Sequence, residues 1–245
     1  MEDYNVVKND FYEISELDDP KWNRNNCYFN LLMEKVIPDK NLFMMCKKLN
    51  TCALAELPNG YHVRTCRRNE LDIWKKMPFD DEKTAEQYSD YMTKYFNDVY
   101  ASKEDLFFNK CLFVCDKNDT PIGTCFAWKA YDRITTIHWF KVVKEYEGLG
   151  IGRALLSVVM KSIPKDEYPV FLHTQPSSFR AIKLYSDFGF ALLTDPVIGY
   201  RQNDLEECLP ILKTYMFKED FEKLQFAQAP ENFLKAVKST CINEF

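Results

Sequence analysis

A chain of 245 residues is long enough for one large domain, or for one ordinary domain with a structured extension. Its apolar fraction of 46% and charged fraction of 28% are typical of a globular protein that buries a sizeable core. The net charge of −5, without any Lys/Arg-rich block, argues against a nucleic-acid partner and suits a cationic or neutral substrate.

The first ten residues, MEDYNVVKND, are polar and acidic and contain no apolar signal segment. No run approaches the roughly 18 consecutive apolar residues that a membrane-spanning helix needs. We therefore expect a cytoplasmic protein that does not span a membrane.

Nine cysteines are scattered along the chain, an odd number that includes no CxxC pair. This spacing indicates neither a disulfide framework nor a zinc site. We expect reduced cysteines that act as small apolar side chains, and no metal.

Residues 1–59 are expected to form a helical N-terminal extension. Apolar residues recur near helical spacing in 27–37, which Pro38 ends, and 41–49 (NLFMMCKKL) could form a second short helix. The turn signal Leu57–Gly60 marks the predicted boundary.

Residues 60–203 alternate between strand and helix patterns. Strands are predicted at 61–66, 111–116, 122–131, 134–143, 169–174 and 190–195, and helices at 70–77, 82–100, 150–162 and 177–188. The middle strands follow one another as an antiparallel meander. The order indicates an α/β fold of the mixed α+β kind, in which helices flank a mixed, mostly antiparallel sheet. Residues 204–245 are expected to form a helical tail packed on this domain, with helices near 204–215 and 231–238.

A glycine-rich segment, Glu147-Gly148-Leu149-Gly150-Ile151-Gly152-Arg153, joins a predicted strand to a predicted helix. Glycines let a phosphate approach the backbone, and the free N–H groups of a helix start bind anions. A tight turn that only needs backbone freedom is the alternative. The segment has neither the GK[ST] of a P-loop nor the G-x-G-x-x-G of a dinucleotide fold.

The stretch VVKEYEGLGIGRALL resembles the acetyl-CoA-binding motif of GNAT acetyltransferases, in which an arginine or glutamine precedes xxGxG or xxGxA. Glu147 stands at the arginine or glutamine position, and Lys144 replaces the usual proline. A second stretch ends in LYSDFGF, similar to the family's LYxxxGF signature, with Ser178 where an asparagine often stands. The resemblance covers residues 60–203 and implies the GNAT fold.

The resemblance implies an N-acetyltransferase that transfers an acetyl group from acetyl-CoA to a primary amine by direct attack. It places the cofactor on Phe140, Lys141, Val142, the segment from Gly148 to Arg153 (Gly148, Leu149, Gly150, Ile151, Gly152, Arg153) and Ser178. A backbone N–H near Val142 would polarise the thioester carbonyl, and Tyr185 would protonate the departing thiolate. Periodicity alone favours a core tyrosine at position 185, and the resemblance reverses this preference.

His173 ends a predicted strand, at a position where some family members carry a glutamate that acts as the general base. His173 is therefore a candidate general base. A structural role and a substrate contact are the alternatives. His138 is a weaker candidate for the same cleft, and His62 is expected to be structural. Trp128, Tyr131 and Trp139 either line an acceptor pocket or pack the sheet.

The acceptor is expected to be a small-molecule or peptide amine, and a homodimer is left open. A catalytically silent acyl-CoA-binding regulatory module is the alternative function, because Glu147 and Ser178 depart from the usual pattern.

Overall fold

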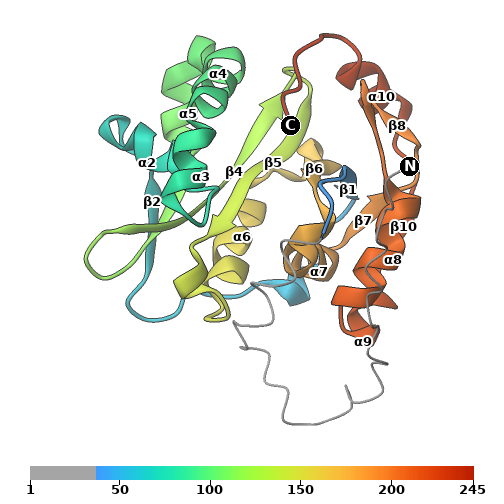
Figure 1. The fold of residues 1–245 in the computed structure, drawn as a ribbon, viewed down its shortest axis with the longest axis horizontal. Helices are drawn as coiled ribbons and strands as arrows, with labels where there is room; N and C mark the ends of the chain where they lie inside the picture. The colour runs from blue at the N-terminus through green and yellow to red at the C-terminus, as the bar shows by residue number, and fades with distance from the viewer. Residues whose placement is uncertain (1–36) are drawn as a thin grey trace, which may run out of the picture. The chain divides into compact units, whose positions relative to one another are not determined.

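The computed structural model describes residues 37–245, which form one compact unit. The predicted helix at 27–37 therefore lies almost wholly outside the described residues. The ribbon and the order of its elements are shown in Figure 1.

An eight-stranded sheet forms the centre of the described unit, in the order β10-β7-β1-β6-β5-β4-β3-β2. Its strands are β1 (Leu42–Cys46), β2 (His62–Thr65), β3 (Leu112–Cys115), β4 (Pro121–Ala130), β5 (Ile134–Val142), β6 (Val170–Thr174), β7 (Phe190–Leu193) and β10 (Phe226–Ala227). A small second sheet pairs β8 (Val197–Ile198) with β9 (Arg201–Gln202). Within the large sheet only β5–β6 and β7–β10 are parallel pairs. This is the mixed, mostly antiparallel sheet that the sequence predicts.

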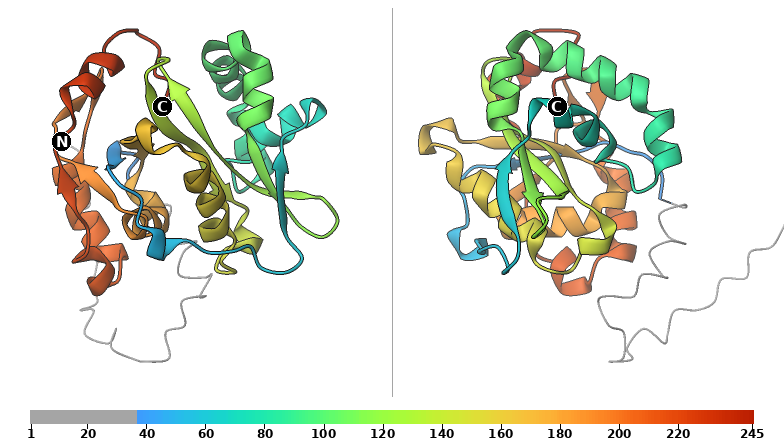
Figure 2. Two further views of the ribbon diagram at one scale, coloured as in Figure 1. Left: turned by 180° about the vertical axis from the view of Figure 1, so that it is seen from behind. Right: turned by 90° about the vertical axis from the view of Figure 1, so that its left-hand side faces the viewer.

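Helices cover both faces of the sheet (Figure 2). They are α2 (Leu71–Lys76), α3 (Glu82–Gln87), α4 (Ser89–Val99), α5 (Glu104–Lys110), α6 (Ile151–Ser162), α7 (Phe179–Asp187), α8 (Leu205–Tyr215), α9 (Lys218–Phe221) and α10 (Glu231–Val237). Buried side chains of α6, α7 and α8 form one apolar cluster, while those of α2, α4, α5 and α10 form another. We call these the α6 face and the α4 face of the sheet.

The short helix predicted at 41–49 is wrong, because residues 42–46 form strand β1. β1 lies between β6 and β7 and is buried along its whole length. Leu42, Met44 and Cys46 join the cluster on the α6 face, whereas Phe43 and Met45 join the one on the α4 face. A strand covered on both faces needs no polar alternation, so its apolar run resembles a buried helix in sequence. The predicted domain boundary at residues 59–60 thus follows a strand that is already part of the sheet.

The single helix predicted over 82–100 is divided into α3 and α4, which meet at Tyr88. Met92, Phe96 and Val99 face the core as the spacing indicates, whereas Tyr88 and Tyr91 are exposed. The described cysteines are all free, and most of them are buried among apolar side chains.

Candidate active site

Strand β5 loses one of its two neighbours half-way along its length. Its pairing with β4 continues to Val142, but its parallel pairing with β6 is confined to Thr135 and Thr136, opposite Val170 and Phe171. Among the described strands, none pairs with the β6-side edge of β5 beyond Thr136. An open strand edge offers backbone N–H and C=O groups to an extended ligand. Phe140, Lys141 and Val142 lie in this stretch.

A β-bulge in the same stretch changes the direction of the side chains. The register with β4 shifts between the pairs Phe126–His138 and Thr124–Lys141, and Trp139 has a φ of 51°. The extra residue places consecutive side chains on one face. Trp139 Nε1 donates to the Tyr100 hydroxyl at 3.1 Å, and His138 Nδ1 lies 2.5 Å from the same oxygen. Phe140 then turns to the opposite, α6 face.

The glycine segment turns the chain from β5 into α6. Gly148 and Gly150 have φ values of 77° and 81°, in the left-handed region that favours glycine. Ile151, Gly152 and Arg153 open the helix, so their N–H groups precede the first intrahelical bond, from Ala154 to Gly150. A methyl group added at Gly150 would meet no described atom within 4 Å. The loop therefore presents free donors and the positive end of a helix dipole to open space, which suits a phosphate.

Phe140 connects this loop with helix α7. Its Cζ atom would lie 3.2 Å from a methyl group added at Gly152, and its ring centroid is 5.8 Å from that of Tyr185. The open edge of β5, the glycine loop and the Tyr185 side chain thus meet around one ring on the α6 face.

Tyr185 is 6% exposed on α7 and packs between the rings of Phe140 and Phe190, both at 5.8 Å. Burial raises the pKa of its phenol. No hydrogen bond joins its hydroxyl to another described residue. A tyrosine in this environment keeps its proton at neutral pH, so the proton is present for transfer, although the raised pKa lowers the driving force for donating it.

A family model described as the acetyltransferase (GNAT) family matches residues 73–190, which include the glycine loop, the β5 edge and Tyr185. Residues 73–190 thus belong to the GNAT superfamily. No curated protein matches it.

Solved structures give further likenesses to this GNAT chain. A GCN5-related N-acetyltransferase from Sphaerobacter thermophilus is 19% identical, with a TM-score of 0.44 over 66% of this chain and 52% of that one. A GNAT-family acetyltransferase from Colwellia psychrerythraea is 14% identical, with a TM-score of 0.45 over 64% and 53%. The chain thus spans about half the length of these two relatives.

Not all residues predicted to bind the cofactor turn their side chains toward the loop. The Arg153 guanidinium donates to the carbonyl of Ala53 at 3.2 Å and pairs with Asp187 of α7 at 2.5 Å. Ile151 is fully buried. The Lys141 ammonium pairs with Asp80. For these three residues only the backbone is left for the cofactor, whereas Leu149 is exposed beside the loop.

Glu147, which replaces the arginine or glutamine of the GNAT motif, pairs with Arg180 at 2.7 Å. Arg180 lies in the first turn of α7, two residues after Ser178, which precedes that helix. A positive charge therefore stands beside the loop despite the acidic residue. Glu147 was the only sign of Arg180 in the sequence, because a glutamate beside an anion site requires a neighbouring cation.

His173 lies on the α4 face, away from the cluster that holds Tyr185. Its ring contacts Phe43, with centroids 5.0 Å apart, and its Nε2 lies 2.9 Å from Asn41 Oδ1. Burial, and then the charge of Arg201, lower the pKa of His173 to about 3. The imidazole is neutral at pH 7, but a base with so low a pKa provides little driving force for proton transfer. Asn41 and Arg201 carried no signal in the sequence.

His138 belongs to a closed hydrogen-bond chain on the α4 face. The Tyr100 oxygen accepts from Trp139, so its proton goes to His138 Nδ1; His138 Nε2 then donates to Thr136 Oγ1 at 2.7 Å. Burial lowers the pKa of His138 to about 3. With both nitrogens engaged, His138 is a structural residue rather than a base.

Trp128 and Trp139, for which the sequence left an acceptor pocket or sheet packing open, pack on the sheet. Trp128 is 3% exposed and meets Tyr100 edge to face at 5.0 Å, and Trp139 contacts Trp74 in the same way at 5.7 Å. Tyr131, at the β4–β5 turn, is also buried and packs on Phe245.

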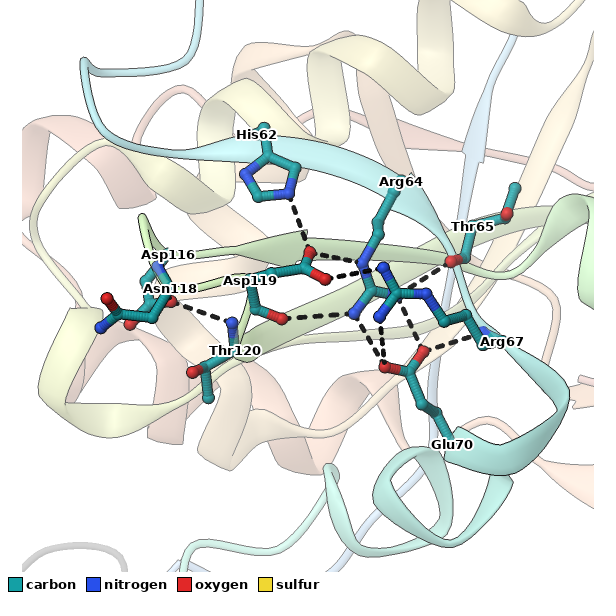
Figure 3. Close-up of polar contacts among 9 residues, drawn as sticks. All are labelled: His62, Arg64, Thr65, Arg67, Glu70, Asp116, Asn118, Asp119 and Thr120. Atoms are coloured by element: carbon teal, nitrogen blue, oxygen red, sulfur yellow. Dashed lines mark hydrogen bonds and ion pairs between the residues drawn. The ribbon is translucent and has the colours of Figure 1, made fainter.

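A polar network on the far edge of the sheet contains His62 (Figure 3). Arg64 binds both carboxylate oxygens of Glu70, at 2.7 and 2.8 Å, and donates to Asp119 at 2.7 Å. Arg67 and His62 also contact Asp119. His62, Asp119 and Cys115 could together offer ligand atoms within 4.8 Å of one another. Because Arg64 and Arg67 both bind Asp119, a metal cation is disfavoured there. We interpret the network as a structural connection between β2 and the β3–β4 turn.

Proposed function

We propose that this protein is an N-acetyltransferase that transfers the acetyl group of acetyl-CoA to a primary amine by direct attack. One observation carries the proposal: the glycine loop at the start of α6, the open edge of β5 and the Tyr185 ring converge on Phe140. Free N–H donors for a pyrophosphate, an edge for an extended arm and a proton donor for sulfur are what this reaction requires.

The cofactor is held mainly by backbone in this account. The N–H groups of Ile151, Gly152 and Arg153 bind the pyrophosphate, and Arg180 adds charge to the same anion from the side. The pantetheine arm lies along β5 as an added strand, beside Phe140, Lys141 and Val142. A backbone N–H near Val142 donates to the thioester carbonyl oxygen, where negative charge develops during attack.

The acceptor reaches the thioester from the α4 face, in its neutral form. The new N–C bond forms as the C–S bond breaks, Tyr185 gives its proton to the sulfur, and water takes the proton that the amine loses. His173 positions that water or the amine through the lone pair of Nδ1. We assign the proton transfer itself to water because of the low pKa of His173.

A catalytically silent acyl-CoA-binding module is the second candidate. Glu147, an acid in the cofactor motif, favours it, although Arg180 offsets that charge. Both candidates bind acetyl-CoA, but only the transferase moves the acetyl group to an amine.

Free-thiol release from acetyl-CoA in the presence of a panel of primary amines tests the proposal. Amine-dependent thiol release with the matching N-acetyl product supports the transferase. Saturable acetyl-CoA binding without release for any amine would favour the silent module, and the lack of both would reject the site.

Several properties remain predictions. The acceptor is a small-molecule or peptide amine, the location is cytoplasmic, the reaction uses neither metal nor nucleic acid, and a homodimer is left open. No helix in the described part of the chain has the length and apolar character needed to cross a bilayer.

A further inference from the structure

Arg201 is a partly buried cation on the α4 face. Its guanidinium lies over the rings of Phe43 and Phe245, 4.8 and 5.5 Å from their centroids, and it donates to the backbone oxygen of Phe245. Among the described residues, no aspartate or glutamate side chain forms an ion pair with Arg201. The other arginines engaged in the site and in the polar network, such as Arg64, Arg153 and Arg180, each have a carboxylate partner.

Partial burial makes the Arg201 charge depend on an oxygen partner. Burial lowers the pKa of Arg201, and the hydroxyls of Tyr131, Tyr95 and Tyr91 act in the opposite direction. A charge withdrawn from water is normally paired with an opposite charge, and the Phe245 oxygen occupies that position on Arg201 in the structure. The planar guanidinium suits a carboxylate, which it can bind through two parallel hydrogen bonds.

Arg201 also stands where an acceptor would enter. Phe43, beneath its guanidinium, is the cross-strand partner of His173, which follows the last β6 residue paired with β5 by two positions. On the other side, Tyr95 packs on Trp139 of the open β5 stretch at 5.2 Å. Arg201 thus packs on the β1 residue that pairs with His173 of β6, and Tyr95 of the same neighbourhood packs on β5.

Residues 244–245 occupy this surface in the structure. The segment runs from α10 back to the β4–β5 turn (Figures 1 and 2). The Tyr131 N–H donates to the Glu244 carboxylate at 2.7 Å, and the Tyr95 hydroxyl donates to the Glu244 carbonyl at 2.9 Å. The Phe245 ring meets Phe43 at 6.2 Å. Arg201 thus binds the Phe245 oxygen, and the Phe245 ring packs beside it on the same surface.

We propose that Arg201 anchors the carboxylate of the acceptor, and that the acceptor is an amino acid whose carboxylate replaces the Phe245 oxygen on the guanidinium. The amino group then points toward the opening between β5 and β6. This inference rests on the proposed function, since it names the acceptor class of the same site. Arg201 is a specificity-determining residue that touches the substrate away from the reacting atoms.

The test compares L-amino acids with their own carboxamides, with phenylalanine and phenylalaninamide as the first pair. The two members differ in the charge that Arg201 would bind, and comparing their kcat/KM ratio between protein variants cancels the different basicity of their amines. Arg201→Gln should lower the acid-to-amide ratio by about tenfold or more, as expected for a lost charge-assisted pair. Arg201→Lys keeps the positive charge but loses the paired donors of the guanidinium, so it should give an intermediate acid-to-amide ratio. This variant also keeps the test valid if Arg201→Gln does not fold. Arg68→Gln removes an exposed arginine from the other edge of the unit and should leave the ratio unchanged.

Calorimetric titration with phenylalanine, without acetyl-CoA, separates the inference from the proposed function. Arg201-dependent binding without acetylation of any amine would uphold the anchor and reject the transferase. Acetylation of amines with the same acid-to-amide ratio in wild type and Arg201→Gln would uphold the transferase and overturn the anchor. The anchor is also overturned if no common L-amino acid of the set binds or reacts.

Discussion

Asn41 Oδ1 lies 2.9 Å from His173 Nε2 and connects the segment before β1 to the strand that carries the predicted base. The amide oxygen is an acceptor, so this contact places the His173 proton on Nε2 and the lone pair on Nδ1; the assignment follows from the hydrogen-bond pattern. The ring is held in one orientation as a neutral group.

His173 is expected to affect turnover without setting its pH dependence. Its folded pKa of about 3 lies below the range in which the enzyme would be assayed, so the imidazole stays neutral throughout it. His173→Ala should lower kcat by a similar factor at every pH from about 5 to 8. A wild-type acid limb near pH 6.5 that disappears in His173→Ala would contradict this and restore the general base. His62→Ala, at an exposed position, is the matched control.

His138 should make the fold sensitive to acid. Its pKa is about 3 in the folded protein, where the side chain is 3% exposed, and about 6.5 in the unfolded chain. Between these values the unfolded chain binds a proton that the folded one does not, so stability falls as the pH falls through this window. From pH 7 to 5, this one group should remove roughly 2 kcal/mol from the free energy of unfolding.

Urea unfolding of wild type and His138→Gln at these two pH values measures the effect. Glutamine can accept from Tyr100 and donate to Thr136, so the variant should lose distinctly less stability on acidification. An equal loss in both proteins would show that His138 is not the group responsible.

Tyr185→Phe deletes the proposed acid and keeps the ring that packs on Phe140 and Phe190. We expect kcat to fall by roughly 100-fold, within the usual range for general acid–base catalysis, with acetyl-CoA affinity and melting temperature near wild type. Tyr168→Phe is the control, since it removes a tyrosine hydroxyl that is buried without a partner among the described residues. If kcat of Tyr185→Phe stays within about twofold of wild type, the thiolate leaves without this donor or chemistry is not rate-limiting.

Local patterns were sufficient for most of the sheet and its helices. β3, β4 and β5 follow the alternation of their sequences, and α6 and α7 follow the two motifs that carry the GNAT resemblance. Strand β1 was missed because its leucine and methionines also favour helix, and only its burial on both faces decides the strand.

The site was less predictable because it depends on long-range contacts and on one bulge. The glycine loop and Tyr185 could be placed from spacing, since each lies within one motif. The separation of His173 from Tyr185 by the sheet, and the pairing of Arg153 with Asp187, depend on elements brought together by the fold. The bulge at Trp139 is a backbone feature for which the side-chain pattern gave no sign.

Acetyl-CoA binding by Gly150→Ala, measured by calorimetry beside Gly60→Ala, tests the central claim most directly. Both glycines have a positive φ, at 81° and 90°, and a methyl group added to either meets no described atom within 4 Å. Both variants should therefore lose similar stability, about 1 kcal/mol. Because only the Gly150 methyl would project into the proposed pyrophosphate position, wild type and Gly60→Ala should bind acetyl-CoA in a one-to-one complex, and Gly150→Ala should bind it at least about tenfold more weakly. Equal acetyl-CoA affinity in all three folded proteins, or no binding by wild type, would contradict the cofactor site at the glycine loop.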